Sequence, residues 1–224
     1  MPYTLAFDVY GTLIDTSGVF ETLQKTIGTP AQPFMEMWRS KQLEYTFRRG
    51  LMGRYVEFSQ CTEEALNFCC QSFDLSLLQT QKSRLMAAYA VLPPFPDVKS
   101  SLQSLNDEGH RCFAFSNGSS AALKQLLDHA ELSEWLEGIV SVEAVQTFKP
   151  SPKVYAHFTE VTQSSLSATW LISGNPFDII GGASYGMRTV WVRRAATSVF
   201  DPWGIKPTHT VNGLEAVADS LPSP

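Results

Sequence analysis

An aspartate at the end of a short apolar stretch is the residue best placed for chemistry in this sequence. Residues 3–8 read Tyr-Thr-Leu-Ala-Phe-Asp, which is typical of a buried strand that ends in a carboxylate, Asp8. Gly11 and Thr12 follow where the chain must turn. A carboxylate at the carboxyl end of a parallel strand lies where open α/β sheets bind ligands, and it can act as a covalent nucleophile. Taken alone, the same pattern fits a helix N-cap or a turn aspartate.

Further polar motifs occur at other predicted strand ends and loops. In chain order they are Ser116-Asn117-Gly118, Lys149-Pro150 before a helix that carries Tyr155, and Ser173 to Asp178. Each has a simple explanation by itself, as a turn, a solvated charge or a helix-terminal acid. If all the strands reach one edge of a sheet, however, these motifs meet there with Asp8. Four such motifs at predicted strand ends and loops arise together by chance much more rarely than one.

The elements that must position these motifs fall into two parts. Residues 34–92 have a helical pattern throughout, and Pro93 to Pro96 break it as a hinge or linker. From Asp97 onward strands alternate with helices, which predicts a parallel sheet covered on both faces. The expected strands are 111–116, 139–142, 169–173 and 189–192, and the expected helices are 121–130, 153–162 and 179–185.

We therefore expect an α/β fold, a doubly wound parallel Rossmann-like sheet with an inserted helical cap. Residues 1–14 and 97–224 form the catalytic core in this interpretation, and residues 15–96 form the cap. The strand Leu5 to Asp8 joins the core sheet, so the cap is an insertion between the first and second strands. A hinged cap can close over the strand ends and exclude water.

Composition narrows the classes of function. The 224 residues carry a formal net charge of −5 without a basic stripe, so we expect no nucleic-acid partner. The four cysteines lack metal-type spacing, and we interpret them as reduced thiols of a cytoplasmic protein. No segment approaches the length of a membrane span, and Met1-Pro2-Tyr3 lacks the features of a signal peptide, so we expect no membrane partner.

The chain resembles the haloacid dehalogenase superfamily over nearly its whole length and, within it, the L-2-haloacid dehalogenases. The resemblance rests on Asp8 to Leu13, Ser116-Asn117-Gly118, Lys149-Pro150 and Ser173 to Asp178. Tyr10 favours the dehalogenases, because phosphatases of the superfamily carry there a second aspartate that protonates the leaving alcohol. A tyrosine, with an ordinary pKa of about 10, is a poor general base, whereas a departing halide needs no proton.

A stretch in the expected cap supports the same branch. Residues 38–45 and 53–58 are similar to cap segments of L-2-haloacid dehalogenases, in which an arginine at the position of Arg39 faces the leaving halogen. A fixed cation suits a departing anion, and we expect Asn117 to hold the halide with it. Three positions depart from the family pattern: Ser40, Gly174 and Phe177. They leave the preferred halogen and the chain length of the substrate open.

The resemblance implies hydrolysis of short-chain (S)-2-haloalkanoic acids to (R)-2-hydroxy acids through an ester on Asp8. Asp178 would activate the water that cleaves this ester, and Lys149 would keep Asp8 ionised. The implied catalytic residues are Asp8, Thr12, Arg39, Ser116, Lys149, Tyr155, Ser173, Asn175 and Asp178. The implied substrate-binding residues are Tyr10, Gly11, Leu43, Phe58, Asn117 and Phe177.

Particular contacts are expected within this set. Thr12 hydrogen-bonds the Asp8 carboxylate, and Tyr155 braces Lys149 or Asp8. Ser116 and the backbone amides after Asp8 hold the substrate carboxylate. Ser173 and Asn175 steer the attacking water with Asp178.

The resemblance implies no cofactor and no metal. A monoanionic carboxylate substrate does not need the Mg²⁺ of the superfamily phosphatases, since Lys149 and Arg39 supply positive charge. The partners are then the 2-haloalkanoic acid, water and the halide product, and the family suggests a homodimer. Two alternatives stay open: a Mg²⁺-dependent small-molecule phosphatase, in which Asp178 would ligate the metal, and a catalytically silent scaffold.

Overall fold

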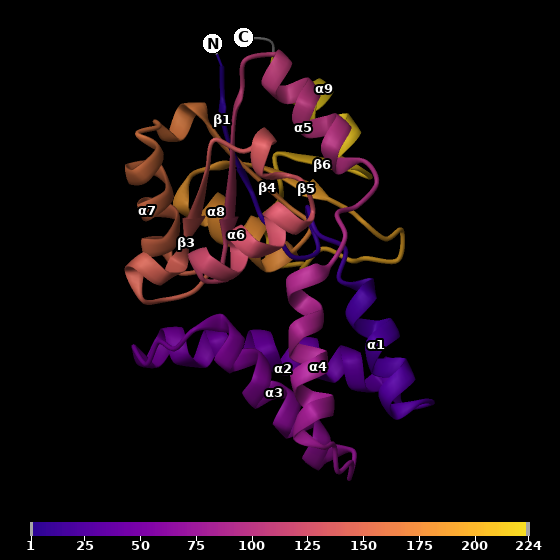
Figure 1. Ribbon diagram of the computed structural model, residues 1–224. Coiled ribbons are helices and arrows are strands. Elements are labelled where there is room, and N and C mark those ends of the chain that lie inside the picture. Colours follow the sequence, from indigo (N-terminus) through magenta and orange to yellow (C-terminus); the bar gives the residue numbers. More distant parts are fainter. Residues whose placement is uncertain (1, 223–224) are drawn as a thin grey trace.

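Six parallel strands form the centre of the computed structural model, which describes residues 2–222 (Figure 1). They are β1 (Thr4–Phe7), β2 (Arg111–Ser116), β3 (Gly138–Ser141), β4 (Thr169–Ser173), β5 (Arg188–Val192) and β6 (His209–Val211). Their order is β3-β2-β1-β4-β5-β6. Phe7, the last residue of β1, pairs with Ala114 of β2 and Ile172 of β4. The residues that follow these three central strands therefore meet at one edge of the sheet.

Helices cover both faces of the sheet. They are α5 (Val98–Asp107), α6 (Ser120–His129) and α9 (Val217–Ser220) on one face, and α7 (Pro152–Thr162) and α8 (Pro176–Tyr185) on the other. Successive side chains of a strand point to opposite faces. Leu5 and Phe7 accordingly pack with α5, α6 and α9, whereas Ala6 packs with α7. Because both faces are covered, the central strands are apolar on both, as a parallel sheet requires.

Helices between β1 and β2 form a second layer beyond the carboxyl ends of the strands (Figure 1). They are α1 (Ser17–Ile27), α2 (Ala31–Met52), α3 (Phe58–Ser72) and α4 (Gln79–Ala88), followed by a 3-10 turn, η1 (Tyr89–Val91). The indole N–H of Trp38 on α2 donates to the carbonyl of Thr62 on α3 at 2.8 Å. This helical layer occupies the segment in which the sequence predicts a cap.

The two connections between the helical layer and the sheet run side by side. The amide of Phe95 donates to the carbonyl of Leu13 at 3.0 Å. Arg194, just after β5, holds both connections: its Nη2 donates to the carbonyl of Thr12 and its Nη1 to Asp97, each at 2.6 Å. The expected hinge is therefore anchored to the loop that follows the first strand.

Most element bounds agree with those predicted from sequence. The bounds of β2 and β4 are as expected, and those of β3, β5, α6 and α7 differ by one residue. Helix α8 begins three residues earlier than predicted, at Pro176, because a proline is favourable in the first turn of a helix. The helical run expected over 34–92 is interrupted: Gly53 ends α2 with a φ of 63°. Within residues 2–222 no helix is long and apolar enough to cross a membrane.

Candidate active site

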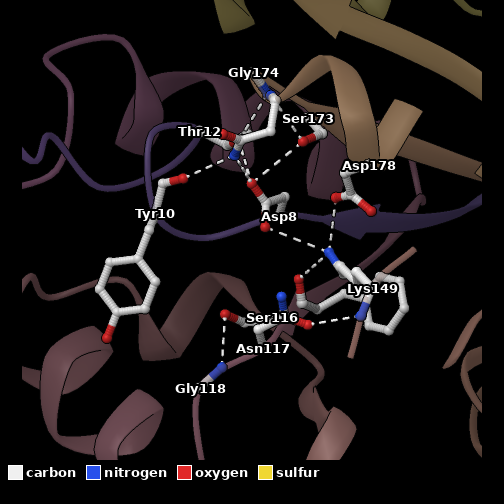
Figure 2. Close-up of polar contacts among 12 residues, drawn as sticks. Asp8, Tyr10, Thr12, Ser116, Asn117, Gly118, Lys149, Ser173, Gly174 and Asp178 are labelled. Carbon is white, nitrogen blue, oxygen red and sulfur yellow. Dashed lines mark hydrogen bonds and ion pairs between the residues drawn. The ribbon is translucent and has the colours of Figure 1, made fainter. Parts of the chain in front are cut away.

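Asp8 lies directly after β1 and receives hydrogen bonds from several separate segments (Figure 2). Its Oδ2 accepts from Thr12 Oγ1 at 2.9 Å, from Ser173 Oγ at 3.2 Å and from Asn175 Nδ2 at 2.7 Å. Its Oδ1 faces Lys149 Nζ at 3.3 Å. The expected contact between Thr12 and the carboxylate is present. The donors around this buried side chain all stabilise a negative charge, and they are distributed unequally between its two oxygens.

Two glycines allow the loops around Asp8 to approach each other. Gly11 has a φ of 78°, a conformation that residues with a side chain rarely adopt. A Cβ at Gly174 would lie 2.3 Å from the carbonyl oxygen of Gly11, so this departure from the family pattern permits close packing of the two loops. The amide of Gly11 already donates to the Ile14 carbonyl at 2.9 Å. The N–H of Gly11 therefore serves its own loop.

Lys149 is fully buried and connects two carboxylates. Its Nζ donates to Asp178 Oδ2 at 2.8 Å and to the Phe115 carbonyl at 2.8 Å, in addition to its contact with Asp8. The ammonium also lies 4.0 Å from the centroid of the Phe115 ring. Removing an ammonium from water costs free energy, and nearby carboxylates offset that cost only when the ammonium and the carboxylates are all held in a fixed geometry. Lys149 thus lies between the two acids and contacts both of them.

Asp178 is the other buried acid of the site. Burial raises its pKa above the ordinary value, Lys149 opposes this shift, and the charge of Asp8 adds to it. Tyr155 Oη donates to Asp178 Oδ1 at 2.9 Å. The expectation that Tyr155 braces Lys149 or Asp8 is corrected, because α7 packs against α8 and brings the hydroxyl to the first turn of α8. Burial raises the pKa of Tyr155 well above its ordinary value, so the phenol keeps the proton that it donates.

Arg39, on α2, connects the helical layer to Asp8 through Asn175. Its Nη2 donates to Asn175 Oδ1 at 3.3 Å, and its Nη1 donates to Gln42 Oε1 at 2.6 Å. Gln42 Nε2 in turn donates to Thr62 Oγ1 at 2.6 Å. Because a guanidinium only donates, it determines which end of each amide faces it. Asn175 must therefore turn its nitrogen toward Asp8.

Gln42 and Thr62 are polar residues of the site that the sequence interpretation missed. Gln42 is 1% exposed and Thr62 3% exposed. The sequence spacing could have indicated Gln42, because it lies three residues after Arg39 and therefore on the same face of a helix. No sequence spacing could have indicated Thr62, because its partner Gln42 lies on another helix.

The loop after β2 is organised by its own polar side chains. Ser116 Oγ accepts from the amide of Gly118 at 3.3 Å. Asn117 Oδ1 accepts from the backbone amide of Lys149 at 2.9 Å, which fixes the lysine segment against this loop. Part of the hydrogen-bonding capacity of both residues therefore serves the loop and the adjoining lysine segment (Figure 2), and their roles toward the substrate and the halide stay predictions.

The apolar members of the expected set lie between the helical layer and the core. Tyr10 stacks on Phe58, with 6.2 Å between ring centroids. Burial raises the pKa of Tyr10 to about 12. Phe177 packs edge-on against Phe47 of α2 at 5.3 Å. Leu43, one turn after Arg39 on the same helix, is half-buried.

Comparison with known proteins agrees with this geometry. A family model described as haloacid dehalogenase-like hydrolase matches residues 4–186. The chain is 36% identical to an (S)-2-haloacid dehalogenase of Pseudomonas sp. (strain YL), over 96% of this chain and 92% of that protein. It is 34% identical to (S)-2-haloacid dehalogenase H-109 of Pseudomonas putida, over 97% and 96% of the two chains.

Solved structures give the same result. The L-2-haloacid dehalogenase from Xanthobacter autotrophicus with chloropropionic acid covalently bound superposes with a TM-score of 0.91. The sequences are 26% identical, and 98% of each chain is covered. Sequence and structure agree over nearly the full length, and the chain belongs to the haloacid dehalogenase-like hydrolases, within the L-2-haloacid dehalogenase family.

Proposed function

We propose that the protein hydrolyses short-chain (S)-2-haloalkanoic acids to (R)-2-hydroxy acids through an ester on Asp8. The observation that carries the proposal is a buried carboxylate with three donors on one oxygen and a single ammonium near the other. Relatives 34–36% identical to the chain are (S)-2-haloacid dehalogenases. The similar Xanthobacter enzyme binds chloropropionic acid covalently, which supports an ester intermediate here.

In the first step, Asp8 Oδ1 attacks C2 of the substrate from the side opposite the halogen. A carbon–oxygen bond forms, the carbon–halogen bond breaks, and the halide leaves with the electron pair while C2 inverts. Oδ1 is the nucleophilic oxygen in this proposal because its one partner, Lys149 Nζ, is 3.3 Å away. Arg39 offers its positive charge to the departing halide.

In the second step, water attacks Cγ of Asp8 and the acyl carbon–oxygen bond breaks. Negative charge then develops on Oδ2, to which Thr12, Ser173 and Asn175 already donate. Donors placed in advance around such an oxygen lower the barrier. Asp178 accepts a proton from the water. One proton of the water ends on the product hydroxyl, and the other is released.

Tyr10 distinguishes this reaction from phosphoester hydrolysis. A phosphatase needs an acid to protonate its leaving alcohol and a base to activate water. With a pKa of about 12, Tyr10 retains its proton near neutral pH and cannot serve as that base. Displacement of a halide needs neither an acid nor a base at this position.

The proposal is tested by incubating the protein with (S)-2-chloropropionate and measuring chloride and (R)-lactate. We expect both products from the wild type and neither from Asp8→Ala, with circular dichroism confirming that the variant folds. A single turnover in ¹⁸O-labelled water should place the label in the Asp8 carboxylate. Label found directly in the lactate would refute the ester intermediate.

We further propose that residues 15–96 act as a cap, and that the protein works as a homodimer in the cytoplasm. The contacts from Arg39 to Asn175 and from Phe47 to Phe177 support a cap that rests on the core. Leu51 and Met52, at the end of α2, are 90% and 64% exposed and form an apolar patch suited to a partner subunit. Sedimentation of the wild type and of Leu51→Glu tests the dimer: we expect the variant to shift toward monomer, and a monomeric wild type would contradict it.

A further inference from the structure

Arg194 lies just after β5 and is held in place by the core. Its Nη1 forms an ion pair with Asp97 Oδ2 at 2.6 Å, and the two side chains are only 16% and 19% exposed. The same carboxylate oxygen accepts from the backbone amide of Leu214 at 2.7 Å. The guanidinium also packs over the ring of Phe95, 4.0 Å from its centroid. These contacts fix the direction in which the remaining nitrogen, Nη2, points.

Thr12 connects this guanidinium to the nucleophile. Arg194 Nη2 donates to the carbonyl of Thr12 at 2.6 Å. The hydroxyl of the same threonine donates to Asp8 Oδ2 at 2.9 Å and accepts from the amide of Gly174 at 2.8 Å (Figure 2). A single residue therefore joins Arg194, which lies outside the proposed reaction, to the carboxylate that performs it.

The carbonyl of Thr12 has no other protein donor within residues 2–222. The loop after β1 closes on the Val9 carbonyl, which accepts the amides of Thr12, Leu13 and Ile14 at 3.2, 2.9 and 2.9 Å. Thr12 is 0% exposed, so without Arg194 its carbonyl would be buried and unpaired. An unpaired buried acceptor costs free energy, which the loop can lower by rotating the peptide that follows Thr12. That rotation would displace the hydroxyl from Asp8.

We propose that Arg194 is a positioning residue for Asp8 and that it acts through Thr12. The proposal rests on the proposed function. By holding the carbonyl of Thr12, Arg194 keeps the hydroxyl directed at Asp8 Oδ2, so that Oδ1 stays turned toward C2 of the substrate. The same hydroxyl then donates to Oδ2 while the ester is cleaved. A displacement of about 1 Å caused by a change far from the reacting atoms can cost about 10²-fold in rate.

The position of Arg194 also separates Thr12 from movements of the helical layer. The two connections to that layer pair with each other: the amide of Asp15 donates to the Pro93 carbonyl at 2.9 Å, and the amide of Phe95 donates to the Leu13 carbonyl at 3.0 Å. Arg194 contacts both connections at their core ends, through Thr12 and Phe95. A displacement of the helices that passes along the paired connections therefore meets a fixed guanidinium before it reaches Thr12.

Arg194→Met tests the proposal, with kcat and KM measured separately for chloride release from (S)-2-chloropropionate. We expect kcat to fall about 10²-fold and KM to change little, because Arg194 lies outside the contacts proposed for the substrate. Arg193→Met is the matched control: Arg193 donates to the carbonyl of Ser198 at 3.0 Å, and both kinetic constants should stay unchanged. A purely structural role would lower the unfolding midpoint and leave kcat of the folded enzyme unaltered, which would overturn the proposal.

A double-mutant cycle tests the route through Thr12. Thr12→Val removes the hydroxyl that contacts Asp8, so adding Arg194→Met to it should lower kcat further by less than about twofold. Losses that multiply in full would overturn the route through Thr12.

Arg194→Lys keeps the test decisive if Arg194→Met does not fold. It retains a cation beside Asp97 but replaces two fixed nitrogens by one, so the variant should fold and still lose at least about tenfold in kcat. An unchanged kcat in this variant would overturn the positioning role alone. Failure of the proposed function looks different, because the wild type would then release no chloride and the positioning role would fall with it.

Discussion

Replacing Lys149 by methionine should destabilise the fold strongly, because it leaves two buried acids without their shared cation. Lys149 Nζ lies 2.8 Å from Asp178 and 3.3 Å from Asp8, and the lysine and Asp178 side chains are 1% and 0% exposed. Removing one partner of a buried ion pair costs about 3–5 kcal/mol. For a domain of this size, that corresponds to a fall in Tm of roughly 6–20 °C.

The loss of stability in Lys149→Met should increase as the pH rises. Burial already raises the pKa of Asp178, and Lys149 opposes that shift. Without the lysine, the pKa of Asp178 in the folded state rises further above its unfolded value of about 3.9. An acid whose folded-state pKa is raised destabilises the fold once the pH exceeds the unfolded value, and the full cost is reached above the folded value. The deficit of the variant should therefore grow from pH 5 to pH 8.

Chemical denaturation of wild type and Lys149→Met at several pH values between 5 and 8 measures this deficit. Lys124→Met is the matched control, because Lys124 forms a solvent-exposed pair with Asp128, and such surface pairs contribute little to stability. Adding Asp178→Asn to Lys149→Met should recover part of the loss by removing one buried charge. A deficit below about 1 kcal/mol, or one that stays constant with pH, would refute the electrostatic reasoning.

Four other changes test the site. Asn175→Ala removes a donor from Asp8 Oδ2, so ester cleavage should slow about 10²–10³-fold and the ester should accumulate in intact-protein mass spectra; undetectable ester at steady state would contradict this. Tyr10→Phe should retain turnover and an unchanged pH profile, whereas loss of a general acid–base group would cost at least about 10²-fold. Gln42→Leu should lower kcat more than it raises KM, because the guanidinium proposed to receive the halide loses a hydrogen-bond partner; a change in stability alone would show that Gln42 has only a structural role. Gly174→Ala should destabilise the protein by about 1–3 kcal/mol in denaturant unfolding, since the added Cβ meets the carbonyl oxygen of the loop after β1; an unchanged midpoint would show that the loops can separate freely.

Local patterns in the sequence were sufficient for the architecture. Apolar runs that alternate with helical segments predicted the parallel sheet, and the ends of β2 and β4 were located to the residue. Asp8 was identified because a carboxylate directly after a buried strand is a strong signal. The short edge strand β6 gave no such signal, because His209 and Thr210 are exposed and the strand has only three residues.

Which donor meets which acceptor was decided by tertiary structure alone. Arg39 and Asn175 are 136 positions apart, and their contact exists because α2 rests on the loop after β4. Tyr155 reaches Asp178, and not Lys149 or Asp8, through the packing of α7 against α8. Gly174 is required by the approach of another loop, a constraint invisible in its own neighbours. Sequence determines where a polar group sits along a strand or helix, whereas hydrogen-bond partners depend on distances of a few tenths of an ångström between segments that only the packed core brings together.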